Sequence, residues 1–83
     1  MNTYVLNVQA RCPLDHGIDV YEFTLESQNI LLCESINAFF KANAGKRRVY
    51  QEALTKSAAT ALGCRVTSVG HHSGIKVTCV SPA

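Results

Sequence analysis

The sequence predicts an α+β fold with one four-stranded antiparallel sheet and two helices on one of its faces. Two segments near each end of the chain alternate between apolar and polar residues, which is the pattern of half-buried β-strands. Between these pairs, apolar residues recur at a spacing near 3.6, which is the pattern of helices with one buried face. The predicted order of elements is therefore ββααββ.

The first predicted hairpin is formed by residues 3–11 and 20–27. In both segments every second side chain is apolar, so each strand has one buried face and one face in water. We expect the two strands to pair in an antiparallel hairpin. The buried set is Tyr4, Leu6, Val8, Ala10, Tyr21, Phe23 and Leu25.

The central part of the chain predicts two helices. Residues 30–33 fit either a continuation of the second strand or the start of the first helix. The first helix is expected from Glu34 to about Gly45, because glycine suits a left-handed stop. The second helix is expected to end at Gly63. The apolar positions are Ile36, Phe39 and Phe40 in the first helix, and Val49, Ala53, Leu54, Ala58, Ala61 and Leu62 in the second.

The last two predicted strands, residues 64–69 and 75–80, are β-branched and alternate again. Residues 70–74 separate them, so we expect a hairpin with a loop of about five residues. This loop contains His71 and His72. Adjacent residues there point to opposite faces, so just one of the two histidines can face a given ligand.

The small size of the chain predicts assembly. Its 83 residues are expected to form one domain, residues 1–83. A chain of this size buries roughly 60% of its unfolded surface, so its core is thin. A four-stranded sheet also has two unpaired edges, which invite pairing with another copy. We therefore expect a homo-oligomer in which strands join edge to edge in a closed ring.

Composition argues against several classes of protein. The first residues lack the charged start and apolar run of a signal peptide, so the four cysteines are expected as reduced thiols in the cytoplasm. No stretch approaches the roughly 20 apolar residues that span a bilayer, so no membrane partner is expected. A net charge of +2 is too small to indicate nucleic-acid binding by itself. Cys33, Cys64 and Cys79 lie in apolar or strand contexts and are interpreted as small core residues.

The loop from Cys12 to Asp19 carries the residues with the most chemistry. It holds a thiol, two carboxylates and an imidazole within eight residues. If the flanking strands pair, the two ends of the loop lie side by side. A nucleophile at Cys12 and a proton donor at Asp19 then face one cleft. The alternative is a polar hairpin loop with a half-buried structural thiol.

Cys12-Pro13, followed after five residues by Asp19, resembles a motif of the nitrile reductases of queuosine biosynthesis (the QueF family) and their shorter amidinotransferase relatives. Glu34-Ser35 at the head of the first helix and Tyr50-Gln51-Glu52 at the start of the second are similar to later motifs of that family. The glycine-containing turn at residues 70–74 is similar as well. The resemblance covers nearly the whole chain. It implies the tunnelling fold, a ββααββ unit whose copies form a barrel with active sites between subunits.

The resemblance also implies a reaction. In that family a cysteine attacks the nitrile carbon of 7-cyano-7-deazaguanine (preQ0) and forms a covalent thioimide. Cys12 then corresponds to the nucleophile, Asp19 to the proton donor, and Glu52 to the carboxylate that accepts hydrogen bonds from the guanine-like edge of the base. The further candidates are Glu34, Ser35 and Gln51 for substrate binding, His16 and His71 as auxiliary groups, and Tyr50 or Phe39 for stacking on the ring.

Two departures from the family bear on the reaction. In the reductases the Glu-Ser pair opens a lysine-bearing helix that helps hold NADPH, but here the first lysine of that helix is Lys41. A glycine-rich dinucleotide turn is also missing. This favours the relatives that add ammonia to the thioimide to make an amidine, as in archaeosine, over NADPH-dependent reduction to 7-aminomethyl-7-deazaguanine. The second departure is Gln51, where the family has histidine; glutamine cannot shuttle a proton, and His16 is a hypothetical substitute.

Other interpretations stay open. His71 and His72 lack the CxxC or HxxxH spacing of zinc sites, so no metal is expected. The segment Lys46-Arg47-Arg48 fits a solvated turn, or a contact to the phosphates of a tRNA or DNA that carries the modified base. The substrate is either the free base or one embedded in such a nucleic acid. A non-catalytic module that binds a purine or pterin would have the same fold and form no covalent adduct.

Overall fold

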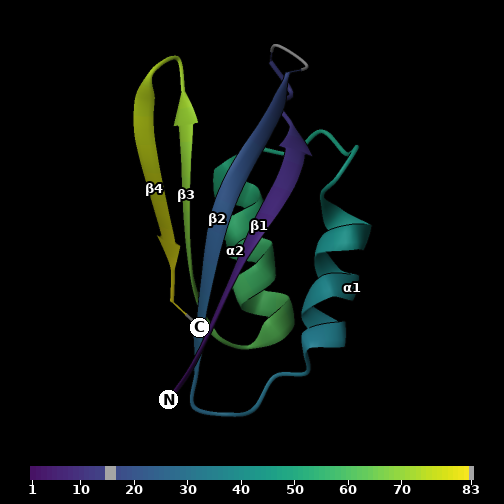
Figure 1. Ribbon diagram of the computed structural model, residues 1–83, viewed down its shortest axis with the longest axis vertical. Coiled ribbons are helices and arrows are strands. Elements are labelled where there is room, and N and C mark those ends of the chain that lie inside the picture. The colour runs from purple at the N-terminus through teal and green to yellow at the C-terminus, as the bar shows by residue number, and fades with distance from the viewer. Residues whose placement is uncertain (15–16, 83) are drawn as a thin grey trace.

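The protein consists of a four-stranded antiparallel sheet with both helices against one face (Figure 1). The structure is a computed structural model that describes residues 1–14 and 17–82. Its elements are β1 (Asn2–Arg11), β2 (Ile18–Ser27), α1 (Cys33–Asn43), α2 (Gln51–Leu62), β3 (Arg65–His72) and β4 (Ile75–Ser81). The strands lie in the order β1-β2-β3-β4 across the sheet. The predicted ββααββ order and α+β class are confirmed.

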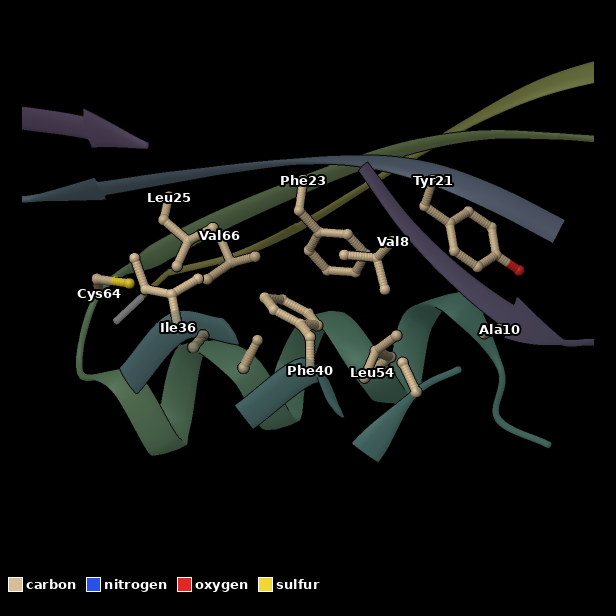
Figure 2. Packing of buried hydrophobic residues seen from close by; sticks show 13 residues of the cluster. Val8, Ala10, Tyr21, Phe23, Leu25, Ile36, Phe40, Leu54, Cys64 and Val66 are labelled. Atoms are coloured by element: carbon tan, nitrogen blue, oxygen red, sulfur yellow. The ribbon is translucent and has the colours of Figure 1, made fainter. Parts of the chain in front are cut away.

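The core lies between the sheet and the two helices (Figure 2). Phe23 at the centre of β2 is fully buried, and its ring centroid lies 4.8 Å from that of Phe40 on α1. The helix α2 contributes Leu54 and two buried alanines, whose small side chains allow close packing against the sheet. The alternation predicted for the first hairpin is confirmed, because the whole predicted set either is buried or packs against the core: Tyr4, Leu6, Val8, Ala10, Tyr21, Phe23 and Leu25.

The opposite face of the sheet is covered by neither helix (Figure 1). Val5, Val20 and Val80 lie on this face and are exposed to 60%, 54% and 50%. An apolar surface on an open sheet face is compatible with assembly, but the homo-oligomer stays a prediction.

The helix ends follow the predicted glycines. Gly63 has a φ of 62°, and its N–H donates to the carbonyl of Ala59 at 2.9 Å, which closes the last turn of α2. Gly45, just beyond α1, has a φ of 69°. The ambiguous residues 30–33 do not extend β2, because α1 starts at Cys33 after a short loop.

The connection between the helices runs beside β1. The N–H of Arg11 donates to the carbonyl of Arg47, and the N–H of Val49 donates to the carbonyl of Arg11, both at 3.1 Å. These bonds hold Val49 outside the helix, so its predicted place in the second helix is wrong, and α2 begins at Gln51. They also cover part of the edge of β1, where the sequence predicted an unpaired edge. The start of α2 is thereby fixed next to the loop that follows β1.

The last hairpin is tighter than predicted. His71 pairs with Lys76 and His72 with Ile75, so the turn has just two residues, Ser73 and Gly74. Both have positive φ, 52° and 79°, as in a type I′ turn, whose twist matches that of the flanking strands. The predicted five-residue loop is therefore wrong, and both histidines belong to β3.

The cysteines are unpaired, and all four lie in the described part of the chain. Cys64 is buried, as predicted. Cys33 is exposed, so its interpretation as a core residue is wrong, because it lies with Glu34 and Ser35 on the solvent side at the start of α1. Cys79 is half-buried. Among residues 1–14 and 17–82, no helix has the length and apolar character needed to cross a membrane.

The Phe23–Phe40 contact predicts a stability change. Replacing Phe40, which is 5% exposed, by alanine leaves a cavity beside Phe23. We expect the free energy of unfolding to fall by about 3–5 kcal/mol, measured by chemical denaturation. The control is Lys41→Ala on the solvent side of the same helix, with an expected change within about 0.5 kcal/mol. Equal losses in the two variants would contradict the core assignment.

Candidate active site

A cavity of about 650 Å³ opens where the end of β1, the start of β2 and the first turns of α2 meet the hairpin β3–β4. Its volume lies within the range of roughly 300–1,000 Å³ that is typical of small-molecule sites. The lining residues are Cys12, Pro13, Leu14, Asp19, Tyr21, Val49, Tyr50, Gln51, Glu52, Ala53, Lys56, His72, Val77 and Cys79.

Strand register brings three reactive side chains together on the wall of this cavity. Asp19 pairs with Ala10 of β1, and the N–H of Cys12 donates to the carbonyl of Gly17 at 2.9 Å. His72 ends β3 on the same face of the sheet, since alternate residues of a strand share a face. The sulfur of Cys12, a carboxylate oxygen of Asp19 and a ring nitrogen of His72 all lie within 4.8 Å of one another.

Tyr21 orients the carboxylate of Asp19. Its hydroxyl donates to Oδ2 of Asp19 at 3.2 Å. Burial raises the pKa of Tyr21 above its ordinary value, and the nearby Asp19 carboxylate raises it further, so the hydroxyl keeps its proton at neutral pH. The ring lies over Gly70, where a Cβ atom would approach Cε1 of Tyr21 to 2.6 Å. Glycine at position 70 is therefore required for Tyr21 to reach Asp19.

Gln51 lines the cavity, but its amide nitrogen is engaged within the protein. It donates to the carbonyl and the hydroxyl of Ser68 at 3.2 and 3.1 Å and to the carbonyl of Val77 at 3.1 Å. Thr55 donates to the carbonyl of Gln51 at 2.7 Å and lies 2.6 Å from the Ser68 hydroxyl. This network ties the start of α2 to β3 and β4, so Gln51 has a structural role whether or not it also contacts substrate.

Glu52 and Tyr50 also face the cavity, from the first turn of α2 and the residue before it. Of the two aromatic residues considered for stacking, Tyr50 lines the cavity, whereas Phe39 packs against Phe40 with ring centroids 5.1 Å apart. Burial raises the pKa of Cys79, and the Glu52 carboxylate raises it further, so this second thiol on the wall is held protonated.

The remaining predicted residues are not brought to the cavity. Glu34 and Ser35 are exposed in the first turn of α1, at the opposite end of the molecule (Figure 1). His71 points to the other face of the sheet, so its predicted auxiliary role is not supported by the geometry. His16 lies outside the described residues.

His72 is the residue that the sequence reasoning missed. Because the turn has two residues, His72 belongs to β3, where its side chain points to the same face as the buried residues of that strand. The predicted five-residue loop did not define the direction of this side chain. The available signal was Ser73-Gly74, since a small polar residue followed by glycine fits a type I′ turn. Among the described residues, Cys12, Asp19 and His72 are also the ones whose donor atoms converge closely enough to hold a metal ion.

Comparison with known proteins identifies the fold. The structure is similar to the crystal structure of the archaeosine synthase QueF-Like in its apo form, with a TM-score of 0.83. The superposition covers 99% of this chain and 91% of that chain, at 17% sequence identity. No family model and no curated protein matches the sequence. The chain therefore has the QueF-like tunnelling-fold unit that the sequence predicted.

Proposed function

We propose that this chain is a QueF-like enzyme that converts the nitrile of 7-cyano-7-deazaguanine into an amidine through a thioimide on Cys12. One observation carries the proposal: Cys12, Asp19 and Glu52 line one cavity in a fold similar to that of an archaeosine synthase. Cys12 directly follows β1, Asp19 belongs to β2 and Glu52 to α2, and all three are residues that the sequence motifs select.

The first step joins the sulfur to the substrate. The thiolate of Cys12 attacks the nitrile carbon, a C–S bond forms, and the C≡N triple bond becomes a C=N double bond. The nitrogen takes up the proton that the thiol has lost, with Asp19 as the carrier. The hydrogen bond from Tyr21 holds the Asp19 carboxylate in place for this transfer.

Substrate recognition is assigned to the start of α2. The carboxylate of Glu52 pairs with an N–H and an exocyclic amine on the guanine-like edge. Tyr50, which is 52% exposed beside Glu52, offers a ring face for stacking. Because the network around Gln51 fixes the first turn of α2, both side chains start from a rigid backbone.

The second step releases the product. Ammonia adds to the thioimide carbon, the C–S bond breaks, and the amidine leaves with Cys12 restored as a thiol. The alternative is hydride transfer from two NADPH molecules, which gives the aminomethyl base. The sequence favours the amidine because the family's lysine-bearing helix for NADPH is not matched in residues 34–40.

Assembly is part of the proposal. Glu34 and Ser35 lie at the far end of the molecule from the cavity. A base bound in the cavity can therefore be contacted only by the Glu34 and Ser35 of a neighbouring copy. The outer strands of the sheet are β4 and β1, and such contacts would form along the edge of β4 and along the N-terminal part of the edge of β1. The exposed Lys46-Arg47-Arg48 segment lies in the connection next to the cavity and would meet the phosphates of a nucleic-acid substrate.

Intact-protein mass spectrometry tests the nucleophile. After mixing with 7-cyano-7-deazaguanine, we expect a mass gain of one ligand per chain, because addition to the nitrile loses no atoms. The gain should vanish in Cys12→Ala and fall strongly in Asp19→Asn. Cys33→Ser, which removes an exposed thiol far from the cavity, serves as the control and should load fully.

The same sample decides between the reactions. Ammonium should discharge the adduct to an amidine, whereas discharge by NADPH alone would favour reduction. No adduct at saturating ligand would remove the covalent chemistry and leave a binding module. An adduct that survives Cys12→Ala would assign the nucleophile to another thiol.

Glu52→Gln tests recognition of the base. Loss of hydrogen bonds to a charged acceptor costs about 1.5–3 kcal/mol, so the ligand concentration for half-maximal loading should rise about ten- to hundredfold. Maximal loading should stay the same, because Cys12 is unchanged. The control is Glu22→Gln, an exposed carboxylate on the uncovered face of β2. A similar rise in both variants would point to net charge as the cause.

A further inference from the structure

We infer that Cys12, Asp19 and His72 form a reversible binding site for a divalent transition metal, with Zn²⁺ the best match. The site lies on the wall of the cavity and goes beyond the proposed function, since no step of the nitrile chemistry uses a metal. It shares the sulfur of Cys12 with that chemistry.

The donor set fits zinc. Zinc binds thiolate, imidazole and carboxylate at about 2.0–2.3 Å, so neighbouring donors of a tetrahedral site lie about 3.4–3.6 Å apart. Here the three donor atoms are within 4.8 Å of one another. An approach of about 1 Å closes the site. His72 can supply that movement, because its side chain is exposed at the end of β3, whereas Cys12 is only 6% exposed.

The backbone that carries the donors is already in place. Asp19 is held by pairing with Ala10, Cys12 by its bond to Gly17, and His72 by pairing with Ile75 across the tight turn. Among the described residues, the backbone at these three positions keeps its pairing when the metal arrives. The conformational entropy lost on metal binding is therefore mainly that of the side-chain rotamers.

Tyr21 supplies a support that metal sites commonly have. Ligating carboxylates are usually hydrogen-bonded by a neighbouring group, which fixes their orientation. The Tyr21 hydroxyl donates to Oδ2 of Asp19, which leaves the other oxygen for the metal. Gly70 makes this arrangement possible, since any larger residue would displace the ring of Tyr21.

Three protein ligands leave a fourth position open toward the cavity, as in zinc sites that exchange water or a substrate. The thiolate and the carboxylate neutralise the charge of Zn²⁺. Glu52 and Lys56, which line the same cavity from α2, bring opposite charges that offset each other. A closed structural site has four protein ligands, so this geometry indicates an open site whose fourth ligand exchanges.

Metal and nitrile would compete for one sulfur. A zinc-bound Cys12 cannot form the C–S bond of the thioimide, so occupation shields the thiol and stops loading. The inferred site is thus a metal-dependent block on the cysteine that the proposed function uses.

His71 and His72 provide a matched pair for the test. They are adjacent, of one residue type and both exposed, but they point to opposite faces of the sheet. Co²⁺ is the probe, because it takes tetrahedral ligands like those of Zn²⁺ and a thiolate–Co²⁺ bond absorbs in the near ultraviolet. Untagged, metal-stripped protein is titrated with Co²⁺, and Zn²⁺ is then added.

We expect one Co²⁺ per chain with a thiolate band that Zn²⁺ abolishes. The band should vanish in Cys12→Ser. The dissociation constant should rise at least about tenfold in His72→Ala and in Asp19→Asn, and stay unchanged in His71→Ala. Circular dichroism confirms that each variant is folded.

Three results would overturn the inference: no thiolate band in the wild-type chain, a band that survives Cys12→Ser, or equal effects of His71→Ala and His72→Ala. The titration contains no nitrile, so its outcome is independent of the mass-spectrometric test of the proposed function. If both sites exist, Zn²⁺ added before 7-cyano-7-deazaguanine should suppress loading, and a chelator should restore it.

Discussion

The register of β2 between β1 and β3 is the constraint on which both the core and the cavity depend. Side chains alternate along a strand, so a slip of one residue would turn Phe23 to solvent and Asp19 away from Cys12. The same pairing buries the aromatic core at the centre of the sheet and gathers the reactive groups at its end. The helices cover one face of the sheet. The observed register is the most stable one because it alone turns the apolar side chains of the strands toward the helices.

The start of α2 is held from two sides. Backbone bonds between β1 and the segment before α2 fix one side, and the amide of Gln51 bonded to Ser68 and Val77 fixes the other. Glu52 therefore projects into the cavity from a rigid turn. The side chain of Gln51 is thus bonded within the scaffold, and the imidazole on the wall of the cavity is that of His72.

The grouping of a thiol, a carboxylate and an imidazole gives one site two proposed chemistries. Nucleophilic attack needs the sulfur of Cys12 exposed to the cavity and a proton carrier beside it, and metal binding needs the same atoms to converge on one point. The buried hydroxyl of Tyr21 serves both by orienting Asp19. Which chemistry prevails depends on whether metal or nitrile occupies the sulfur.

The sequence by itself determined the order of the strands and helices and the buried face of the first hairpin, because the periods of 2 and 3.6 are local properties. In α2 it was wrong in part, since Ala53 and Ala61 are exposed and Thr55 and Ala59 are buried. Motif spacing also selected Cys12, Asp19 and Glu52, which the structure brings to one cavity, while their roles remain predictions. Only the tertiary structure decided between His71 and His72, since positive φ at Ser73 and Gly74 sets the length of the turn and hence the direction of each ring. The tertiary structure alone placed Glu34 and Ser35 far from the cavity. It also gave Gln51 its hydrogen-bond partners Ser68 and Val77, which lie 17 and 26 residues further along the chain. Such contacts depend on how the hairpins and helices pack, and no local pattern of residues encodes them.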